Sequence, residues 1–212
     1  FSDHGANRLG ASALMQGLAD GYFVLPYTIA DYLSADIRTG AISTDTPEFN
    51  EAEKEIKEKI NFFLTNKGTH TVDHFHKQLG HIMWNKVGMG RTPEGLREAI
   101  KEIEEVRNNF WKDVRVPGDS DNMNPELEKA FRVADFLELG QLMAIDALNR
   151  NESCGGHFRE DHATPEGEAE RDDVNYKYVA AWEYKGMDIN QSVVHKEDLV
   201  YENIEVKARS YK

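Results

Sequence analysis

The residues with the clearest chemical potential stand near the start of the chain, where Asn7 and Arg8 precede the small residues Gly10-Ala11-Ser12-Ala13. The guanidinium of Arg8 can bind a carboxylate through two parallel hydrogen bonds. The small residues predict the first turn of a helix, whose N–H groups lack internal partners, carry partial positive charge and can be approached closely. This stretch predicts a site for an anion or an electron-rich ring edge. The alternative is a solvated arginine beside a closely packed helix.

The same stretch carries a family pattern. His4-Gly5-Ala6-Asn7-Arg8-Leu9-Gly10, followed by Ser12 and Leu14, resembles the motif near the end of the FAD-binding domain in flavoprotein subunits of fumarate reductase and succinate dehydrogenase. The resemblance implies that Arg8 binds a carboxylate of fumarate or succinate, and that Ser12, Ala13 and Leu14 bind FAD. That family usually has Gly-Asn-Ser-Leu where this chain has Ala11 to Leu14, so the backbone contacts are retained while the hydroxyl moves to Ser12.

A second motif lies in residues 152–161. Glu-Ser-Cys-Gly-Gly-His-Phe-Arg-Glu-Asp resembles Glu-Ser-Arg-Gly-Ala-His-Ala-Arg-Glu-Asp, which follows the helical bundle in the same subunits, and it departs from that pattern at Cys154, Gly156 and Phe158. We expect a structural polar network rather than a catalytic group, formed by His157, Arg159, Glu160 and Asp161. No local feature strongly lowers the pKa of Cys154, so we expect an inert thiol.

Four histidines crowd one further segment. His70 and His74 have the i, i+4 spacing of a helical metal pair, and His76 and His81 lie nearby. A metal site needs a third ligand, and neither a cysteine nor a His-Glu-x-x-His pattern accompanies them. We therefore predict histidines on a polar helix face and no metal.

Composition narrows the possible partners. The chain has 212 residues, is 40% hydrophobic and carries a net charge of -13, which suits a globular core but not a nucleic-acid phosphate backbone. The lone Cys154 excludes an internal disulfide. The longest apolar run, residues 21–30, is shorter than the ~20 residues of a membrane span, so we expect none. The chain begins with Phe1 and shows no signal peptide, so we expect a piece of a longer protein.

Apolar periodicity and capping residues predict the elements. Residues 10–33 indicate a buried helix or two, with a kink or break at Pro26. X-Pro-Glu openings at Thr46, Thr92 and Asn124, and a threonine cap at 69 or 71, start four more helices. The first of these helices should have one apolar face, made of Phe49, Ala52, Ile56, Ile60 and Phe63.

After a loop over residues 151–173, two β-prone runs at 176–184 and 199–206 predict an antiparallel strand pair. The predicted fold is mainly α, an antiparallel, spectrin-repeat-like helical bundle with a small C-terminal β segment. We expect residues 1–34 to end an FAD-binding domain with its buried helix, residues 35–150 to form the bundle domain, and residues 151–212 to form the C-terminal loop and β segment.

The resemblance implies a function for the whole subunit: interconversion of fumarate and succinate by hydride transfer with FAD. Its implied partners are an iron–sulfur subunit and a membrane anchor subunit, which would hold it peripherally on the inner face of the cytoplasmic membrane. The dinucleotide fold, the flavin-linking histidine and the proton-delivering arginine of the family are not in this sequence. We therefore expect this fragment alone neither to retain FAD nor to be active. The alternative is a non-enzymatic helical interaction module that docks an iron–sulfur partner.

Overall fold

The computed structural model describes residues 10–186, 188–203 and 205–206. The chain divides into two compact units, Phe1–Lys57 and Glu58–Lys212. In the first, α1 (Gly10–Ala19) continues through a π-helical turn η1 (Asp20–Val24) into α2 (Leu25–Leu33). Pro26 stands in the first turn of α2, where its missing N–H is tolerated. Helical conformation continues from Gly10 to Leu33, so there is no break at Pro26; a π-helical turn lies just ahead of the proline instead.

The predicted burial of residues 10–33 is not seen within this chain and stays a prediction for the larger protein. Large apolar side chains along the segment are exposed, with Phe23 at 71%: they include Leu14, Leu18, Phe23, Leu25, Ile29 and Leu33. The periodicity marked an apolar helix correctly. Burial of that helix requires a surface that these residues do not supply.

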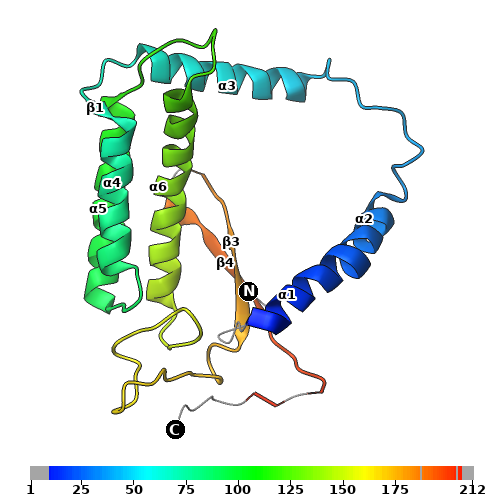
Figure 1. Cartoon of the computed structure of the whole chain (residues 1–212), viewed down its shortest axis with the longest axis vertical. Coiled ribbons are helices and arrows are strands. Elements are labelled where there is room, and N and C mark those ends of the chain that lie inside the picture. The colour runs from blue at the N-terminus through cyan, green and yellow to red at the C-terminus, as the bar shows by residue number, and fades with distance from the viewer. Residues whose placement is uncertain (1–9, 187, 204, 207–212) are drawn as a thin grey trace. The chain divides into compact units, whose positions relative to one another are not determined.

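The second unit contains the predicted bundle, formed by α4 (Val72–Lys86), α5 (Pro93–Asp113) and α6 (Pro125–Asn149) (Figure 1). Each helix begins with a side-chain cap that satisfies an otherwise unpaired N–H: Thr71 accepts from His74, Thr92 from Gly95, and Asn124 from Leu127. These caps confirm the predicted starts of the three helices.

A short parallel pair, β1 (His70–Thr71) with β2 (Val114–Arg115), was not predicted. β1 directly precedes α4 and β2 directly follows α5, so the pairing joins the start of one helix to the end of the next. The approach is close at Gly68, where an added Cβ would lie 2.1 Å from the carbonyl oxygen of Asp113. α4 and α5 are therefore antiparallel, and this junction closes one end of the bundle.

Aromatic rings fill the core at that end. Phe63 packs against Phe131 and Trp111 with ring centres 5.2 and 5.5 Å away, and Phe75 meets Phe110 at 5.4 Å. Phe63 belongs to the last turns of α3 (Pro47–Thr65). Of the predicted apolar face of α3, Phe49, Ala52 and Ile56 are exposed, whereas Phe63 is fully buried in the core.

The C-terminal β segment is an antiparallel pair, β3 (Tyr178–Glu183) with β4 (Val193–Asp198), joined through a short 3₁₀ turn, η2 (Ile189–Gln191). The predicted second strand at 199–206 is wrong. All of β4 is exposed and half of its residues are charged, so it lacks the apolar alternation that marks a half-buried strand, and its pairing with β3 defines it instead. Within the described residues, no helix is both long and apolar enough to cross a membrane.

Candidate functional site

The structure describes only part of the predicted carboxylate site. Arg8 lies outside the described residues, whereas α1 begins at Gly10 and places Ser12 and Ala13 in its first turn. Ala13 is buried and the side chain of the next residue, Leu14, is 65% exposed. The first turn of α1 carries no acidic residue, so no carboxylate of its own neutralises this positive helix end.

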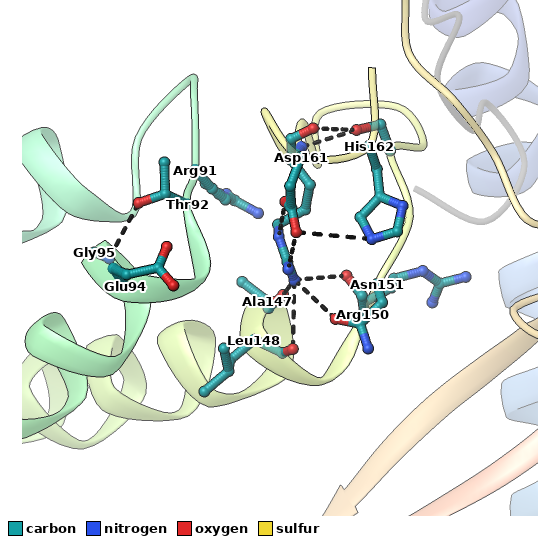
Figure 2. Close-up of polar contacts among 12 residues, drawn as sticks. Arg91, Thr92, Glu94, Gly95, Ala147, Leu148, Arg150, Asn151, Asp161 and His162 are labelled. Carbon is teal, nitrogen blue, oxygen red and sulfur yellow. Dashed lines mark hydrogen bonds and ion pairs between the residues drawn. The ribbon is translucent and has the colours of Figure 1, made fainter. Parts of the chain in front are cut away.

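The second sequence motif folds into a network around Arg159, whose side chain is 2% exposed. Figure 2 shows Ala147, Leu148, Asn151 and Asp161, which belong to this network. Its Nη1 lies 3.2–3.4 Å from three backbone oxygens at the end of α6, those of Ala147, Leu148 and Arg150, and from the side-chain oxygen of Asn151. The last carbonyls of a helix have no internal partners. Arg159 therefore caps the C-terminal end of α6.

Asp161 balances the charge of Arg159. The carboxylate accepts from Nε and Nη2 over 2.9 Å each, and this pairing lowers the pKa of Asp161. The hydroxyl of buried Ser153 completes the loop, accepting from the N–H of Arg159 over 2.8 Å and donating to its carbonyl over 3.1 Å. The predicted polar network of His157, Arg159 and Asp161 is thus confirmed, and Glu160 joins it through its backbone.

Arg91 extends this network to the connection between α4 and α5. Its Nη1 donates to Nδ1 of His157 over 2.7 Å, and its Nε lies within hydrogen-bond distance of the carbonyl oxygens of Val87 and Gly88. Burial lowers the pKa of Arg91. Sequence reasoning missed Arg91 because its partner is 66 residues away, and no local spacing links the two.

A pocket of about 530 Å³ lies beside this network, between the end of α6 and the β3–β4 pair. Arg150 donates to buried Glu152 and to the carbonyl of Tyr176, and its guanidinium carbon lies 5.3 Å from the ring centre of Tyr178. Through these bonds the side chain of Arg150 stabilises the fold. The pocket lining also includes carboxylates of both Asp146 and Asp172, so it is not a cationic site for a dicarboxylate.

The histidine cluster is tied to the β1–β2 junction. Nδ1 of His70 is bonded to the carboxylate of Asp113, which also accepts from the N–H of Thr69 over 2.7 Å, and these bonds lower the pKa of Asp113 to about 2. The rings of His70 and His74 stack with centres 4.2 Å apart. Across residues 10–186, 188–203 and 205–206, no group of three or more His, Cys, Asp or Glu side chains is arranged to hold a metal ion.

Cys154 lies at a tight turn and exchanges backbone hydrogen bonds with His157. Burial, followed by the charge of Glu152, raises the pKa of its thiol. A raised pKa disfavours the reactive thiolate, in line with the inert thiol predicted from the sequence.

Comparison with known proteins identifies the family of this chain, which the geometry alone does not show. Residues 76–211, which span the bundle, the Arg159 network and the β segment, match the family model described as fumarate reductase flavoprotein C-term. The chain belongs to this family. The match begins after the N-terminal motif, so the family is established by a part of the chain independent of Arg8.

Relatives of this family align with nearly the whole chain. The fumarate reductase flavoprotein subunit of Helicobacter pylori is 29% identical over 98% of this chain, and the succinate dehydrogenase flavoprotein subunit of Bacillus subtilis is 25% identical over 93%. This chain spans only 28% and 34% of the length of those relatives. The aligned region is therefore about a third or less of each of those subunits.

The fold agrees with this membership. A chain of a solved quinol–fumarate reductase with menaquinol molecules superposes on 94% of this chain with a TM-score of 0.73 and 24% sequence identity. That chain is also longer, with 32% of it covered. The likeness confirms the predicted fold class, a mainly α helical bundle with a small β segment.

Proposed function

We propose that this chain is the C-terminal part of an FAD-containing subunit that interconverts fumarate and succinate. The observation that carries the proposal is the family match over residues 76–211, together with the His4-to-Gly10 motif upstream of it. The match is to a part of an oxidoreductase flavoprotein, which favours this function over a non-enzymatic helical module. Because the chain covers 28% of the Helicobacter relative, the activity belongs to the larger subunit.

Arg8 has the substrate role in this proposal. Its guanidinium binds one carboxylate of the four-carbon dicarboxylate and polarises the substrate as charge develops during hydride transfer. The whole chain carries a net charge of -13, so its overall field repels a dicarboxylate. The attraction must therefore be local, and Arg8, which precedes the helix N-terminus in the sequence, would supply it.

The start of α1 suits a flavin ring. Its first turn combines small residues with unpaired N–H groups and contains no acidic side chain, so an electron-rich ring edge can approach the backbone. Ser12, Ala13 and Leu14 are the residues proposed to hold the flavin there. When bound, FAD supplies the hydride chemistry, and this chain supplies binding and orientation.

The exposed apolar side chains of α1, η1 and α2 support a place within a larger domain. Soluble proteins rarely expose contiguous apolar surface on this scale. We assign residues 1–34 to the end of the FAD-binding domain, where upstream parts of the subunit would cover side chains such as Phe23 and Ile29. Residues 35–150 form the helical domain in this assignment, and residues 151–212 the C-terminal loop and β segment.

The proposed partners are an iron–sulfur subunit and a membrane anchor subunit. Support comes from the similar chain in a quinol–fumarate reductase solved with menaquinol. Electrons for fumarate then reach the flavin through the iron–sulfur partner. The subunit is held at the inner face of the cytoplasmic membrane through these partners.

The test is to express the full subunit and this 212-residue chain separately, then measure bound flavin and fumarate reduction with a reduced dye. We expect the full subunit to bind FAD and reduce fumarate, and this chain alone to do neither. A full subunit that contains FAD but leaves both fumarate and succinate unchanged would contradict the proposal. Substantial fumarate reduction by the isolated chain would contradict the proposal that the activity needs parts of the subunit outside this chain.

A further inference from the structure

His157 connects two segments that are far apart in the sequence. Its Nδ1 lies 2.7 Å from Nη1 of Arg91, and its Nε2 lies 2.9 Å from the carbonyl oxygen of Arg150. A guanidinium can only donate hydrogen bonds, so Nδ1 must accept and Nε2 must carry the proton that it donates to the carbonyl. This arrangement uses the neutral imidazole with one defined tautomer.

The bonds around His157 close the loop of residues 154–160 onto the α4–α5 connection. Arg91 donates its backbone N–H to the carbonyl of Phe158 over 3.0 Å, and Glu160 donates to the carbonyl of Arg91 over 2.9 Å. The side chain of Arg91 also bonds the carbonyls of Val87 and Gly88. One imidazole thus joins the 154–160 loop, the α4–α5 connection and the end of α6.

Positive charge surrounds the imidazole on every side that packs against it. Arg91 faces it from the α4–α5 connection, Arg150 from the end of α6 and Arg159 from its own loop. Burial lowers the pKa of His157 most; the bond to the carbonyl of Arg150 raises it, the charges of Arg91, Arg159 and Arg150 lower it, and the net pKa lies below the ordinary value of 6.5. The carboxylates nearby are engaged elsewhere: Glu152 accepts from Arg150, Asp161 from Arg159, and Asp146 from Trp182.

We propose that His157 is a pH-sensitive latch whose neutral form holds the 154–160 loop against the α4–α5 connection and whose protonation releases it. Protonation puts a hydrogen on Nδ1, which then points at a guanidinium that cannot accept it. The Arg91 bond is lost and two like charges face each other in a half-buried site. The released loop carries Arg159 with it, so the C-terminal end of α6 loosens as well.

The direction with pH follows from linkage. In the open loop the imidazole has an ordinary pKa near 6.5, whereas the closed loop lowers it. The open form therefore binds more protons. Above the ordinary pKa of 6.5, the closed loop is favoured to its full extent. Below it, the equilibrium constant for closing the loop falls by about tenfold for each pH unit, until the pH reaches the lower pKa of the closed form.

Hydrogen exchange followed by mass spectrometry tests this on the full subunit that contains the chain. After correction for intrinsic rates, we expect protection of residues 154–160 to fall between about pH 7.5 and about pH 5.5, by at most about tenfold. His157→Gln retains one acceptor and one donor but cannot be protonated, so its protection should be equal at the two pH values. A peptide from α5 serves as the internal control and should not change.

Unchanged protection of the wild-type loop across this range would overturn the proposal, as would an equal fall in His157→Gln. A second readout on the wild-type protein does not depend on the variant. Slow exchange of the imidazole C2 hydrogen gives the titration midpoint of His157 directly. A midpoint below 6.5 supports the latch, and a midpoint at or above 6.5 overturns it.

Discussion

The indole Nε1 of Trp182 donates to Oδ1 of Asp146 over 2.8 Å, and this bond fastens β3 to α6. A two-stranded pair is only marginally stable by itself, so the hairpin depends on such attachments. In a double-mutant cycle with Trp182→Phe and Asp146→Ala, we expect a coupling energy of about 1–2 kcal/mol in the free energy of unfolding. Additive effects of the two substitutions would show that the bond contributes nothing to stability.

Arg159 should be the most sensitive arginine of the loop. Arg159→Met removes the donor to the last carbonyls of α6 and leaves the partly exposed Asp161 without its cation, so we expect a loss of about 1–3 kcal/mol in urea unfolding. Arg132→Met is the matched control, because Arg132 and its partner Glu128 are 64% and 63% exposed. That control should change stability by less than about 0.5 kcal/mol. Equal effects of the two substitutions would contradict the capping role.

Gly80 in the middle of α4 and Gly88 just after the helix should respond in opposite ways to alanine. An added Cβ at Gly80 meets nothing within 4 Å, so Gly80→Ala should stabilise the helix by about 0.5–1 kcal/mol. An added Cβ at Gly88 lies 2.5 Å from the backbone oxygen of Trp84, so Gly88→Ala should destabilise the protein by about 1–3 kcal/mol. Thermal unfolding of both variants checks the pair. The same sign for both would show that the turn after α4 rearranges freely.

The bonds to Asp113 predict a pH dependence of stability. The pKa of this carboxyl is lowered from 3.8 to about 2, first by the bond from His70 and then by those from Thr69. Its contribution is therefore fully present above 3.8 and disappears as the pH falls to about 2. Asp113→Asn should be less stable than the wild type at neutral pH, and the difference should shrink in acid.

Denaturant unfolding at neutral pH and at about pH 2 measures this difference. Asp121→Asn, in the exposed connection between α5 and α6, is the control and should behave like the wild type throughout. A difference for Asp113→Asn that persists undiminished in acid would assign its effect to something other than the charge.

Helices and strands were predicted correctly where the residues that define the element lie within its own segment of the sequence. The caps at Thr92 and Asn124 and the apolar spacing that follows them define α5 and α6 without reference to the rest of the chain. The strand β4 lacked such a signal, because its charged residues are exposed and only pairing with β3 defines it.

Burial and long-range polar contacts could not be predicted in the same way. Phe49 and Phe63 share an apolar pattern on α3, but only Phe63 reaches the bundle. Likewise the second motif pointed to His157 and Arg159, while Arg91 carried no local signal. Resemblance rather than spacing indicated the role of Arg8, and that role stays a prediction.

The substitution Arg8→Ala in the full subunit tests the central claim most directly. Loss of the proposed carboxylate-binding group should lower fumarate turnover by about 10²–10³-fold, while the flavin content stays unchanged. Arg38→Ala, an arginine in the exposed connection after α2, is the matched control and should keep wild-type turnover. Near-normal fumarate turnover in Arg8→Ala, with flavin bound, would contradict the account.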